Sequence, residues 1–314
     1  MKLDILRAHN IVRRCMRSYS MMEMNIFDRK TKQHQRDVIT RDPNYQQYFY
    51  LKDEIGFRVF DRLCDVKRTF DIALDLGCGL GHVASHITSL QQLVNHRLYM
   101  VESSRSLLEN AKTSADVPCI KVHCDEETLD DTPLVENSVD LVLKLLKPDG
   151  VFIASLFGTD TIYELRVCLQ LAEQEILGGV YPHVSPFTTV RDMGDLLNSA
   201  GYTLITLDSD ELVVNYPGIW ELMRDLKGMG ESNCSWSRPL TLRRDVIKRA
   251  EEIYRERYGN PDGSIPATFC ILSFVGWKPD PSQPSPAQRG SGTASIKEIS
   301  DFVTQTDQSS PPER

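Results

Sequence analysis

The residues with the clearest chemical pattern are Gly77, Gly79 and Gly81, which follow an apolar run that contains Asp75. Because glycine has no Cβ, this spacing lets the chain turn tightly and lie close to a ligand. A helix is expected to begin after the turn, and the first N–H groups of a helix have no partner inside it. Since His82 stands where a Gly-x-Gly-x-x-Gly sequence requires its third glycine, a dinucleotide phosphate fits this turn poorly.

Glu102, which ends the next apolar run at 97–102, is a second acid that fits a nucleotide site. In βαβ nucleotide-binding units, an acid about 20 residues beyond the glycine turn accepts hydrogen bonds from the ribose hydroxyls. The alternative is a βαβ unit whose glycines serve only the packing of a helix on a strand. Because the second acid falls where a ribose needs it, we predict a nucleotide-binding α/β sheet.

The stretch from Phe70 to Ala84 resembles motif I of the class I S-adenosylmethionine methyltransferases. The resemblance implies an α/β fold with a Rossmann-like sheet and helices on both faces. It also implies that the glycine loop passes beneath the methionine part of S-adenosylmethionine and that an acid holds the ribose. The residues that it assigns to the cofactor are Asp75, Gly77, Gly79, Gly81 and Glu102.

An acid after the third expected strand, 119–123, extends this resemblance. In the methyltransferase pattern an acid at this place binds the adenine amino group, for which a carboxylate is the natural acceptor. We predict Asp125 for this role, with Glu126 as the reserve. The alternative is a solvated acidic loop that continues to Asp131.

The composition is that of one large or two small soluble domains. The chain has 314 residues, of which 41% are hydrophobic and 25% charged, and its formal net charge is −8. It has no basic stripe, which argues against a nucleic-acid partner. Its eight cysteines form no C-x-x-C pair and no zinc spacing, so we expect reduced thiols and no metal site made by cysteine. No apolar run reaches the length of a transmembrane helix.

The two ends of the chain differ in composition from its middle. Residues 1–24 are basic, with one acid, Asp4, before Glu23, and resemble a mitochondrial transit peptide, although an ordinary basic arm is the alternative. Residues 278–314 are dominated by Pro, Ser, Gly and Gln, which predicts a disordered tail. The remaining residues, 25–277, are expected to form the methyltransferase-like domain.

Apolar periodicity and turn residues predict the elements of this domain. Strands are expected before Gly77 and at 97–102, 119–123, 138–143, 150–157, 202–207, 211–215 and 267–277. Helices are expected at 45–66, 81–92, 103–112, 163–177, 220–226 and 244–258, and Thr188 is expected to cap a helix that runs to Ala200.

The connection between the fourth and fifth expected strands is unusually short. Only Lys144 to Asp149 separates them, whereas parallel neighbours need a crossover of a dozen or more residues, normally a helix. The pattern therefore indicates a chain without this crossover helix, and one hypothesis is a splice variant or gene model that lacks about 20 residues. Residues after the fourth strand usually line the reactive end of S-adenosylmethionine, so such a chain would lose part of its catalytic floor and would fold poorly.

Five downstream segments carry a more specific resemblance. They are similar to those of the mitochondrial complex I assembly factor 5 family, arginine hydroxylases with a methyltransferase-like fold, and the likeness covers about 25–277. A more distant likeness is to the malonyl-[acyl-carrier protein] O-methyltransferase of biotin synthesis. The segments are 163–166, 181–187, 214–218, 225–233 and 264–268.

This family resemblance implies a function that composition and spacing do not. The implied protein is peripheral to the matrix face of the mitochondrial inner membrane. It hydroxylates an arginine of a quinone-module subunit, and its partners are that subunit and early assembly intermediates of complex I. Two alternatives stay open, namely an S-adenosylmethionine-dependent O-methyltransferase of a carboxylate and a non-catalytic assembly chaperone.

The candidate catalytic residues lie just past the fifth strand, because ligands of open α/β sheets bind outside the carboxyl ends of the strands. They are Tyr163, Glu164 and Arg166, to which the loop residue His183 is added. Glu164 has the chemistry to pair a substrate guanidinium through two parallel hydrogen bonds. The alternative is that Glu164 caps the helix while Arg166 forms a surface salt bridge.

Other polar and aromatic residues are weaker candidates. A substrate wall is predicted from Tyr216, Trp220, Asn233 and Trp236, for which core packing explains the aromatic residues equally well. No arrangement of two histidines and one carboxylate that would hold iron is evident, so no metal is predicted. For the pair His82 and His86 a surface or capping role is the expectation.

Overall fold

The computed structural model describes residues 26–88, 93–124, 146–239, 241–285, 287 and 289–291. The chain divides into two units, Met1–Pro279 and Asp280–Arg314. In the second unit, the Asp280 carboxylate accepts hydrogen bonds from the N–H and the hydroxyl of Ser282. The predicted transit peptide, the strand at 138–143, and the predicted adenine-binding Asp125 and Glu126 lie outside the described residues, and the predictions of the transit peptide and the disordered tail stay untested.

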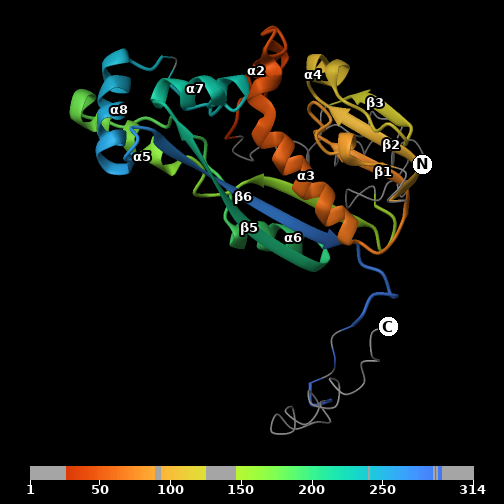
Figure 1. Ribbon diagram of the computed structural model, residues 1–314. Coiled ribbons are helices and arrows are strands. Elements are labelled where there is room, and N and C mark those ends of the chain that lie inside the picture. Colours follow the sequence, from red (N-terminus) through yellow and green to blue (C-terminus); the bar gives the residue numbers. More distant parts are fainter. Residues whose placement is uncertain are drawn as a thin grey trace, which may run out of the picture. The chain divides into compact units, whose positions relative to one another are not determined.

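The first sheet of the larger unit carries the glycine turn at its carboxyl edge (Figure 1). It contains the parallel strands β1 (Phe70–Leu76), β2 (Val94–Glu102) and β3 (Cys119–His123), in the order β1-β2-β3. Leu76 pairs with Val101 and Glu102 pairs with His123. Because parallel strands end at the same edge of a sheet, the glycine turn and Glu102 come together there.

The second sheet is antiparallel and contains β4 (Val151–Phe157), β5 (Thr203–Tyr216) and β6 (Ile265–Trp277), in the order β4-β6-β5. The central strand β6 is almost wholly buried, whereas the edge strand β5 alternates between exposed and half-buried residues. Two separate strands were expected where β5 is continuous. That prediction was wrong because Ser209 and Asp210, which resemble a turn in sequence, pair with β6 instead.

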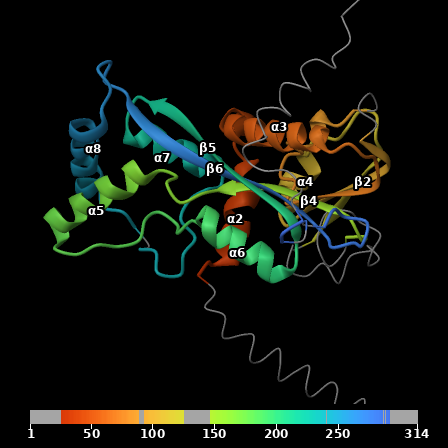
Figure 2. The same ribbon diagram turned by 90° about the horizontal axis from the view of Figure 1, so that it is seen from below.

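Among the described helices of five or more residues, four lie near the first sheet or lead into it, and four accompany the second. The first group is α2 (Arg29–Ile39), the 3₁₀ helix η1 (Tyr45–Phe49), α3 (Tyr50–Asp65) and α4 (Arg105–Asn110). The second group is α5 (Tyr163–Leu177), α6 (Val190–Ala200), α7 (Ile219–Gly228) and α8 (Arg244–Tyr258). Both views show β5 and β6 running from the α5 and α8 end of the unit toward α3 (Figures 1 and 2).

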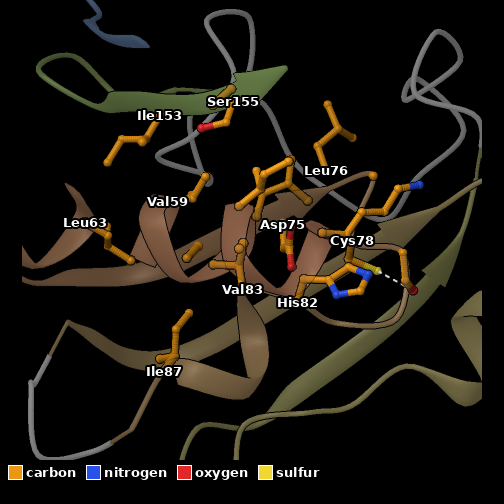
Figure 3. Close-up of a pocket in the computed structure, with 18 of the residues that line it drawn as sticks. Val59, Leu63, Asp75, Leu76, Cys78, His82, Val83, Ile87, Ile153 and Ser155 are labelled. Atoms are coloured by element: carbon orange, nitrogen blue, oxygen red, sulfur yellow. Dashed lines mark hydrogen bonds between the residues drawn. The ribbon is translucent and has the colours of Figure 1, made fainter. Parts of the chain in front are cut away.

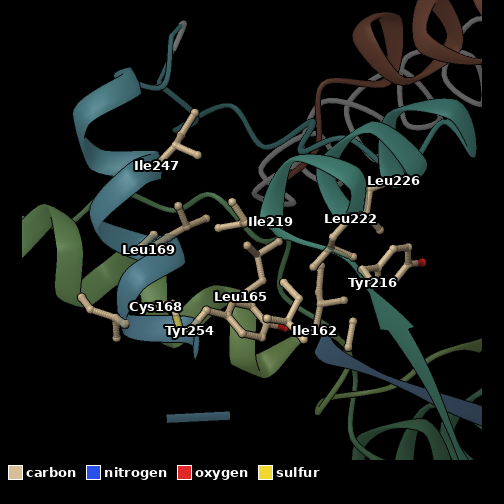
Figure 4. Packing of buried hydrophobic residues seen from close by; sticks show 14 of the residues in the cluster. Ile162, Leu165, Cys168, Leu169, Tyr216, Ile219, Leu222, Leu226, Ile247 and Tyr254 are labelled. Atoms are coloured by element: carbon tan, nitrogen blue, oxygen red, sulfur yellow. The ribbon is translucent and has the colours of Figure 1, made fainter. Parts of the chain in front are cut away.

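The largest hydrophobic core joins α5, α7 and α8 to the second sheet (Figure 4). Leu165 and Leu169 of α5 meet Ile219 and Leu222 of α7, and Tyr254 of α8 closes the cluster. Burying each such aliphatic side chain contributes about 1.5–3 kcal/mol. The Tyr254 hydroxyl donates to the carbonyl of Pro266 at 2.7 Å, so its polar end is satisfied inside the core. This core fixes the start of α5, where the catalytic candidates lie.

The segment after the glycine turn is not the helix expected at 81–92. Its described part contains turns and a single short 3₁₀ helix, η2 (Ala84–His86). The N–H groups of His86 and Ile87 reach back three residues rather than four, and Ile87 is buried in an extended conformation. The helical prediction was wrong for 81–88, because burial of Ile87 ends the turn early. The cap predicted at Thr188 belongs to Thr189, whose hydroxyl accepts the N–H of Asp192.

The outer edges of β1 and β4 carry no strand among the described residues. Val151 and Ile153 of β4 nevertheless share a buried cluster with Phe70 and Ala73 of β1. The described chain therefore forms two sheets where one had been expected. No helix of the described residues is long and apolar enough to span a membrane.

Candidate functional site

A cavity of about 440 Å³ lies at the glycine turn, between β1, α3 and β4. Figure 3 shows Asp75 and His82 at the glycine-turn side and Ile153 of β4 across from them. Most of the wall is apolar, with Val59 and Leu63 supplied by α3. The polar groups of the wall are Arg36, Lys52, Asp75, Ser155 and His82. A mostly apolar cleft with few polar groups is the usual form of a small-molecule site.

The three glycines of the turn have positive φ angles but different surroundings. The φ values are 73° at Gly77, 56° at Gly79 and 78° at Gly81. Gly77 and Gly79 line the cavity. A Cβ on Gly81 would instead lie 2.0 Å from the carbonyl oxygen of Lys112. Gly81 therefore serves the packing of the turn against the end of α4, while the first two glycines face the ligand space.

Asp75 lines this cavity with a carboxylate oxygen that has no hydrogen-bond donor. This atom, Oδ2, is buried and has no partner among the residues that the structure describes. Burial, with a smaller effect of the Glu102 charge, raises the pKa of Asp75 to about 7. An orphaned buried oxygen is costly unless a ligand supplies a donor. Asp75 thus has the geometry to accept an N–H or O–H group of a bound molecule.

Glu102 is wholly buried, and its carboxylate already has several donors. One oxygen accepts the N–H of Gly79 at 3.0 Å and pairs with the guanidinium of Arg36, which comes from α2. The other oxygen accepts the N–H of Ser104 at 2.8 Å. The structure thus brings Glu102 to the glycine turn, and a ribose at this carboxylate would take the place of Arg36.

His82 forms a dyad with Asp53 of α3. Its Nδ1 lies 2.6 Å from the carboxylate of Asp53, and its ring stacks on Phe49 with the centroids 5.5 Å apart. Its Nε2 is buried without a partner. Burial lowers the pKa of His82 despite the Asp53 carboxylate, so the ring is neutral near pH 7. His82 lines the cavity, whereas a surface or capping role had been expected for it. His86, for which the same role was expected, packs against the ring of Phe60.

An ion-pair bridge connects this cavity to a second one. Glu231 lies 2.7 Å from Lys32 of α2 and 2.8 Å from Lys52 of α3. Burial raises the pKa of Glu231, but the two ammonium groups outweigh this effect and lower it to about 2. Lys52 lines the first cavity, whereas Lys32 and Glu231 line the second.

The second cavity, of about 220 Å³, lies between α5, α7 and the loop at 183–187. Three aromatic rings contribute to its wall, those of Phe157, Phe187 and Phe269. Its polar groups include His183, Asn233, Glu231 and Lys32. Of the four residues predicted as catalytic, only His183 lines this cavity.

The structure does not bring all four predicted catalytic residues to one cavity. Tyr163 is exposed and packs edge-on against Tyr258, with the ring centroids 5.9 Å apart. Glu164 is buried, and its carboxylate accepts the hydroxyl of Thr268 in β6 at 2.5 Å. Glu164 therefore ties α5 to β6 and lines neither described cavity. Its carboxylate does not cap the helix, which was the alternative, and its predicted contact with the substrate stays a prediction.

Arg166 and His183 meet in a third cavity, of about 320 Å³, behind α5. His183 Nε2 lies 2.6 Å from the buried carboxylate of Glu173, which also accepts the N–H of Tyr181 at 2.8 Å. Within the described part of the chain, the guanidinium of Arg166 forms no surface salt bridge, and its buried Nε and Nη2 atoms have no hydrogen-bond partner.

The predicted substrate wall is also dispersed. Tyr216 is buried. Its hydroxyl lies 2.7 Å from the hydroxyl of Tyr50 and donates to the carboxylate of Asp225 at 2.7 Å. Trp220 and Trp236 are exposed at 40% and 62%, away from the cavities. Asn233 alone of the predicted wall reaches the second cavity. Among the described residues no group of three metal-ligating side chains converges.

Known proteins with similar sequences agree with this α/β architecture. Residues 73–148 match the family described as a methyltransferase domain. The mitochondrial arginine-hydroxylase NDUFAF5 of Danio rerio is 49% identical over 92% of this chain and 94% of its own length. The human protein of the same name is 45% identical over 90% of this chain and 85% of its own length. This chain belongs to the NDUFAF5 arginine-hydroxylase family. It is thus a member of an enzyme family, as its downstream segments predicted.

More distant matches carry other names. A malonyl-[acyl-carrier protein] O-methyltransferase of Methylovorus is 26% identical over 75% of this chain and 84% of its own length. Among solved structures, the YcgJ protein of Bacillus subtilis covers 71% of this chain and 99% of its own, with a TM-score of 0.43 and 13% identity. The methyltransferase domain confirms the predicted class I fold class. Membership of the NDUFAF5 family favours the hydroxylase over both alternatives, the O-methyltransferase and the chaperone.

Sequence reasoning missed four charged residues of the site. Arg36, Lys32 and Lys52 belong to the helices before β1, and Glu231 lies in a family segment but was not singled out. One feature of the sequence could have identified Glu231, because it is an acid between the glycine-rich end of α7 and Asn233. Its lysine partners lie 179 or more residues earlier in the chain, and short-range patterns do not reveal such pairs.

Proposed function

We propose that this chain hydroxylates an arginine of a quinone-module subunit of complex I. Action on the matrix face of the mitochondrial inner membrane is part of the proposal. The observation that carries it is the 49% identity to the Danio rerio arginine-hydroxylase over 92% of this chain. Mitochondrial location is supported by the names of the relatives. The specific subunit and the membrane face come from the family resemblance of the sequence.

The proposal places S-adenosylmethionine in the cavity at the glycine turn. The residues fit such a ligand in two respects: Gly77 and Gly79 leave the backbone open to it, and Asp75 offers an unsatisfied oxygen. Glu102 would hold the ribose once Arg36 withdraws. When bound, S-adenosylmethionine supplies a methyl group on a sulfonium, which a hydroxylation does not consume. We therefore assign these residues to binding alone.

The second cavity is proposed to take the arginine of the substrate. A guanidinium is flat and stacks on aromatic faces, which Phe157, Phe187 and Phe269 supply. Glu231 adds a negative charge at the polar end of the cavity, although Lys32 and Lys52 hold it at present. Glu173 orients the ring of His183 through a hydrogen bond of 2.6 Å. These side chains bind and orient the substrate; the residues described assign no oxidant.

The test is to express the full chain in cells that lack their own family member and to measure a mass gain of 16 Da on an arginine of the quinone module. We expect this chain to restore the modification. We expect Phe187→Leu, which removes a ring from the second cavity, to reduce it at least tenfold at equal protein level. Phe57→Leu is the matched control, because Phe57 is 47% exposed and lines no described cavity. If this chain restored no modification while complexes still assembled, the hydroxylase proposal would be wrong.

A further inference from the structure

We propose that Arg166 forms a carboxylate-binding subsite in the third cavity, beside the cavity assigned to the substrate arginine. Arg166 lines this cavity together with Tyr181, His183, Ser235 and Ser237. The two cavities share Leu169, His183 and Val184 in their walls. A ligand that occupies one cavity therefore lies next to the other.

The guanidinium of Arg166 is the reason to expect an anion here. Its Nε and Nη2 atoms have no exposed surface and no hydrogen-bond partner among the described residues. An arginine stays charged in proteins, so its donors are not removed by losing a proton. Burying such donors without acceptors is costly, whereas a paired and hydrogen-bonded charge is tolerated. The structure thus shows half of an ion pair.

The identity of the two orphaned atoms points to a carboxylate. Nε and Nη2 form one edge of the guanidinium, and their N–H groups point the same way. Arg249 uses this same edge for Glu175, at 2.6 Å and 3.4 Å. Arg243 uses it for Asp245, at 3.1 Å and 2.5 Å. Two carboxylates of this chain are therefore held by the edge that Arg166 leaves empty.

Two described acids close to Arg166 in sequence are engaged elsewhere. Glu173 accepts from Tyr181 and pairs with His183, while Glu164 accepts from Thr268. Neither of them supplies the carboxylate for Arg166. The mouth of the cavity is open to another molecule, because Tyr181 in its wall is 51% exposed.

Two probes distinguish the sources of the carboxylate. The first is sodium acetate, compared with sodium chloride at equal ionic strength. The second is a pair of peptides that contain one arginine and differ only by Glu or Gln a few residues away; this arm rests on the proposed function. Binding to the full chain is measured by calorimetry. We expect the Glu peptide to bind about tenfold more tightly than the Gln peptide, which matches a charge-assisted hydrogen bond.

Arg166→Gln should abolish this tenfold preference, whereas Arg249→Gln should keep it, because the guanidinium of Arg249 already has a carboxylate. An effect of acetate alone that also disappears in Arg166→Gln supports the subsite and assigns it to a small carboxylate. No response to either probe overturns the proposal. So does a parent-like peptide preference in Arg166→Gln.

Folding is monitored separately by thermal unfolding. If Arg166→Gln lowers the midpoint while the parent chain shows neither the acetate effect nor the peptide preference, the carboxylate is internal to the chain and the proposal fails. The hydroxylase proposal is judged by the mass gain on arginine, not by binding. A chain that prefers the Glu peptide but restores no hydroxylation would keep the subsite and lose the proposed activity.

Discussion

Asp75 and Glu231 are acids at neighbouring cavities, and the structure gives them opposite environments. Asp75 has a buried oxygen without a donor, and burial raises its pKa to about 7. Glu231 lies between Lys32 and Lys52, whose charges outweigh burial and lower its pKa to about 2. The acid with an orphaned oxygen is available to a ligand, whereas the paired acid holds elements together.

This difference extends to the regions around the two acids. The glycine-turn side of the first cavity comes from one short stretch, because Asp75, Gly77 and Gly79 follow one another at the end of β1. At the second cavity, Glu231 joins the segment after α7 to Lys32 of α2 and Lys52 of α3 through ion pairs. The first region should therefore depend on backbone geometry and the second on charge.

Gly81→Ala should be the most damaging change in the first region. The new Cβ would lie 2.0 Å from the Lys112 carbonyl oxygen at a φ of 78°. Left-handed strain and overpacking against backbone together cost about 4 kcal/mol of unfolding free energy, which urea denaturation would measure. Gly178→Ala is the control, since its φ is 68° with nothing within 4 Å, and it should lose about 1 kcal/mol. Equal losses would refute a packing role for Gly81.

Glu231→Gln tests the second region through its charge. Removing one member of a mostly buried ion network leaves Lys52 without its counter-charge and should cost about 3 kcal/mol. Glu175→Gln breaks only an exposed pair with Arg249 and should cost less than about 1 kcal/mol. Urea denaturation of both variants at pH 7 measures the difference between these two losses of unfolding free energy.

The same substitution has a defined pH dependence. The pKa of Glu231 in the folded chain lies below its ordinary 4.5, so its stabilisation is complete above that pH. It is lost as the pH falls from about 4.5 to 2. The difference between the parent and Glu231→Gln should shrink over this window. A difference that stayed constant down to pH 2 would show that lost packing, rather than lost charge, explains the variant.

Much of the fold could be predicted because its signals are local. The helices at 163–177 and 244–258 and the strand at 119–123 were predicted with the observed bounds. Apolar periodicity indicates the two helices, and a Gly directly after each marks its end. The errors arose where tertiary contacts decide. β6 holds Ser209 and Asp210 in a strand, and burial of Ile87 ends the turn after Gly81.

The residues of the candidate site also divide into those that a local pattern indicates and those whose partners are distant in sequence. Asp75, Gly77 and Gly79 were found from spacing, and the structure places them at a cavity. Their role in binding stays a prediction. Glu164 was a candidate from its position after β4, but its carboxylate bonds Thr268, 104 residues away. No local pattern reports such a distant partner, nor the contact of Arg36 with Glu102.

Asp75→Asn should have the smallest effect on folding and the most specific effect on binding. Between pH 4 and pH 7 the folded chain keeps the Asp75 proton that the unfolded chain releases, so stability falls as the pH rises. Asparagine does not titrate, so the variant lacks this loss of stability. We expect the variant to match the parent at pH 4 and to exceed it by about 2 kcal/mol at pH 8, as measured by urea denaturation.

The same variant should bind S-adenosylmethionine about tenfold more weakly at pH 8, because an amide replaces the carboxylate offered to the ligand. A gain in stability with a loss of binding is the pattern expected where a site keeps a strained group for its ligand. Asp71→Asn is the matched control: Asp71 is exposed on the same strand and should change neither quantity. If Asp75→Asn bound the ligand normally, the orphaned oxygen would not be part of the cofactor site.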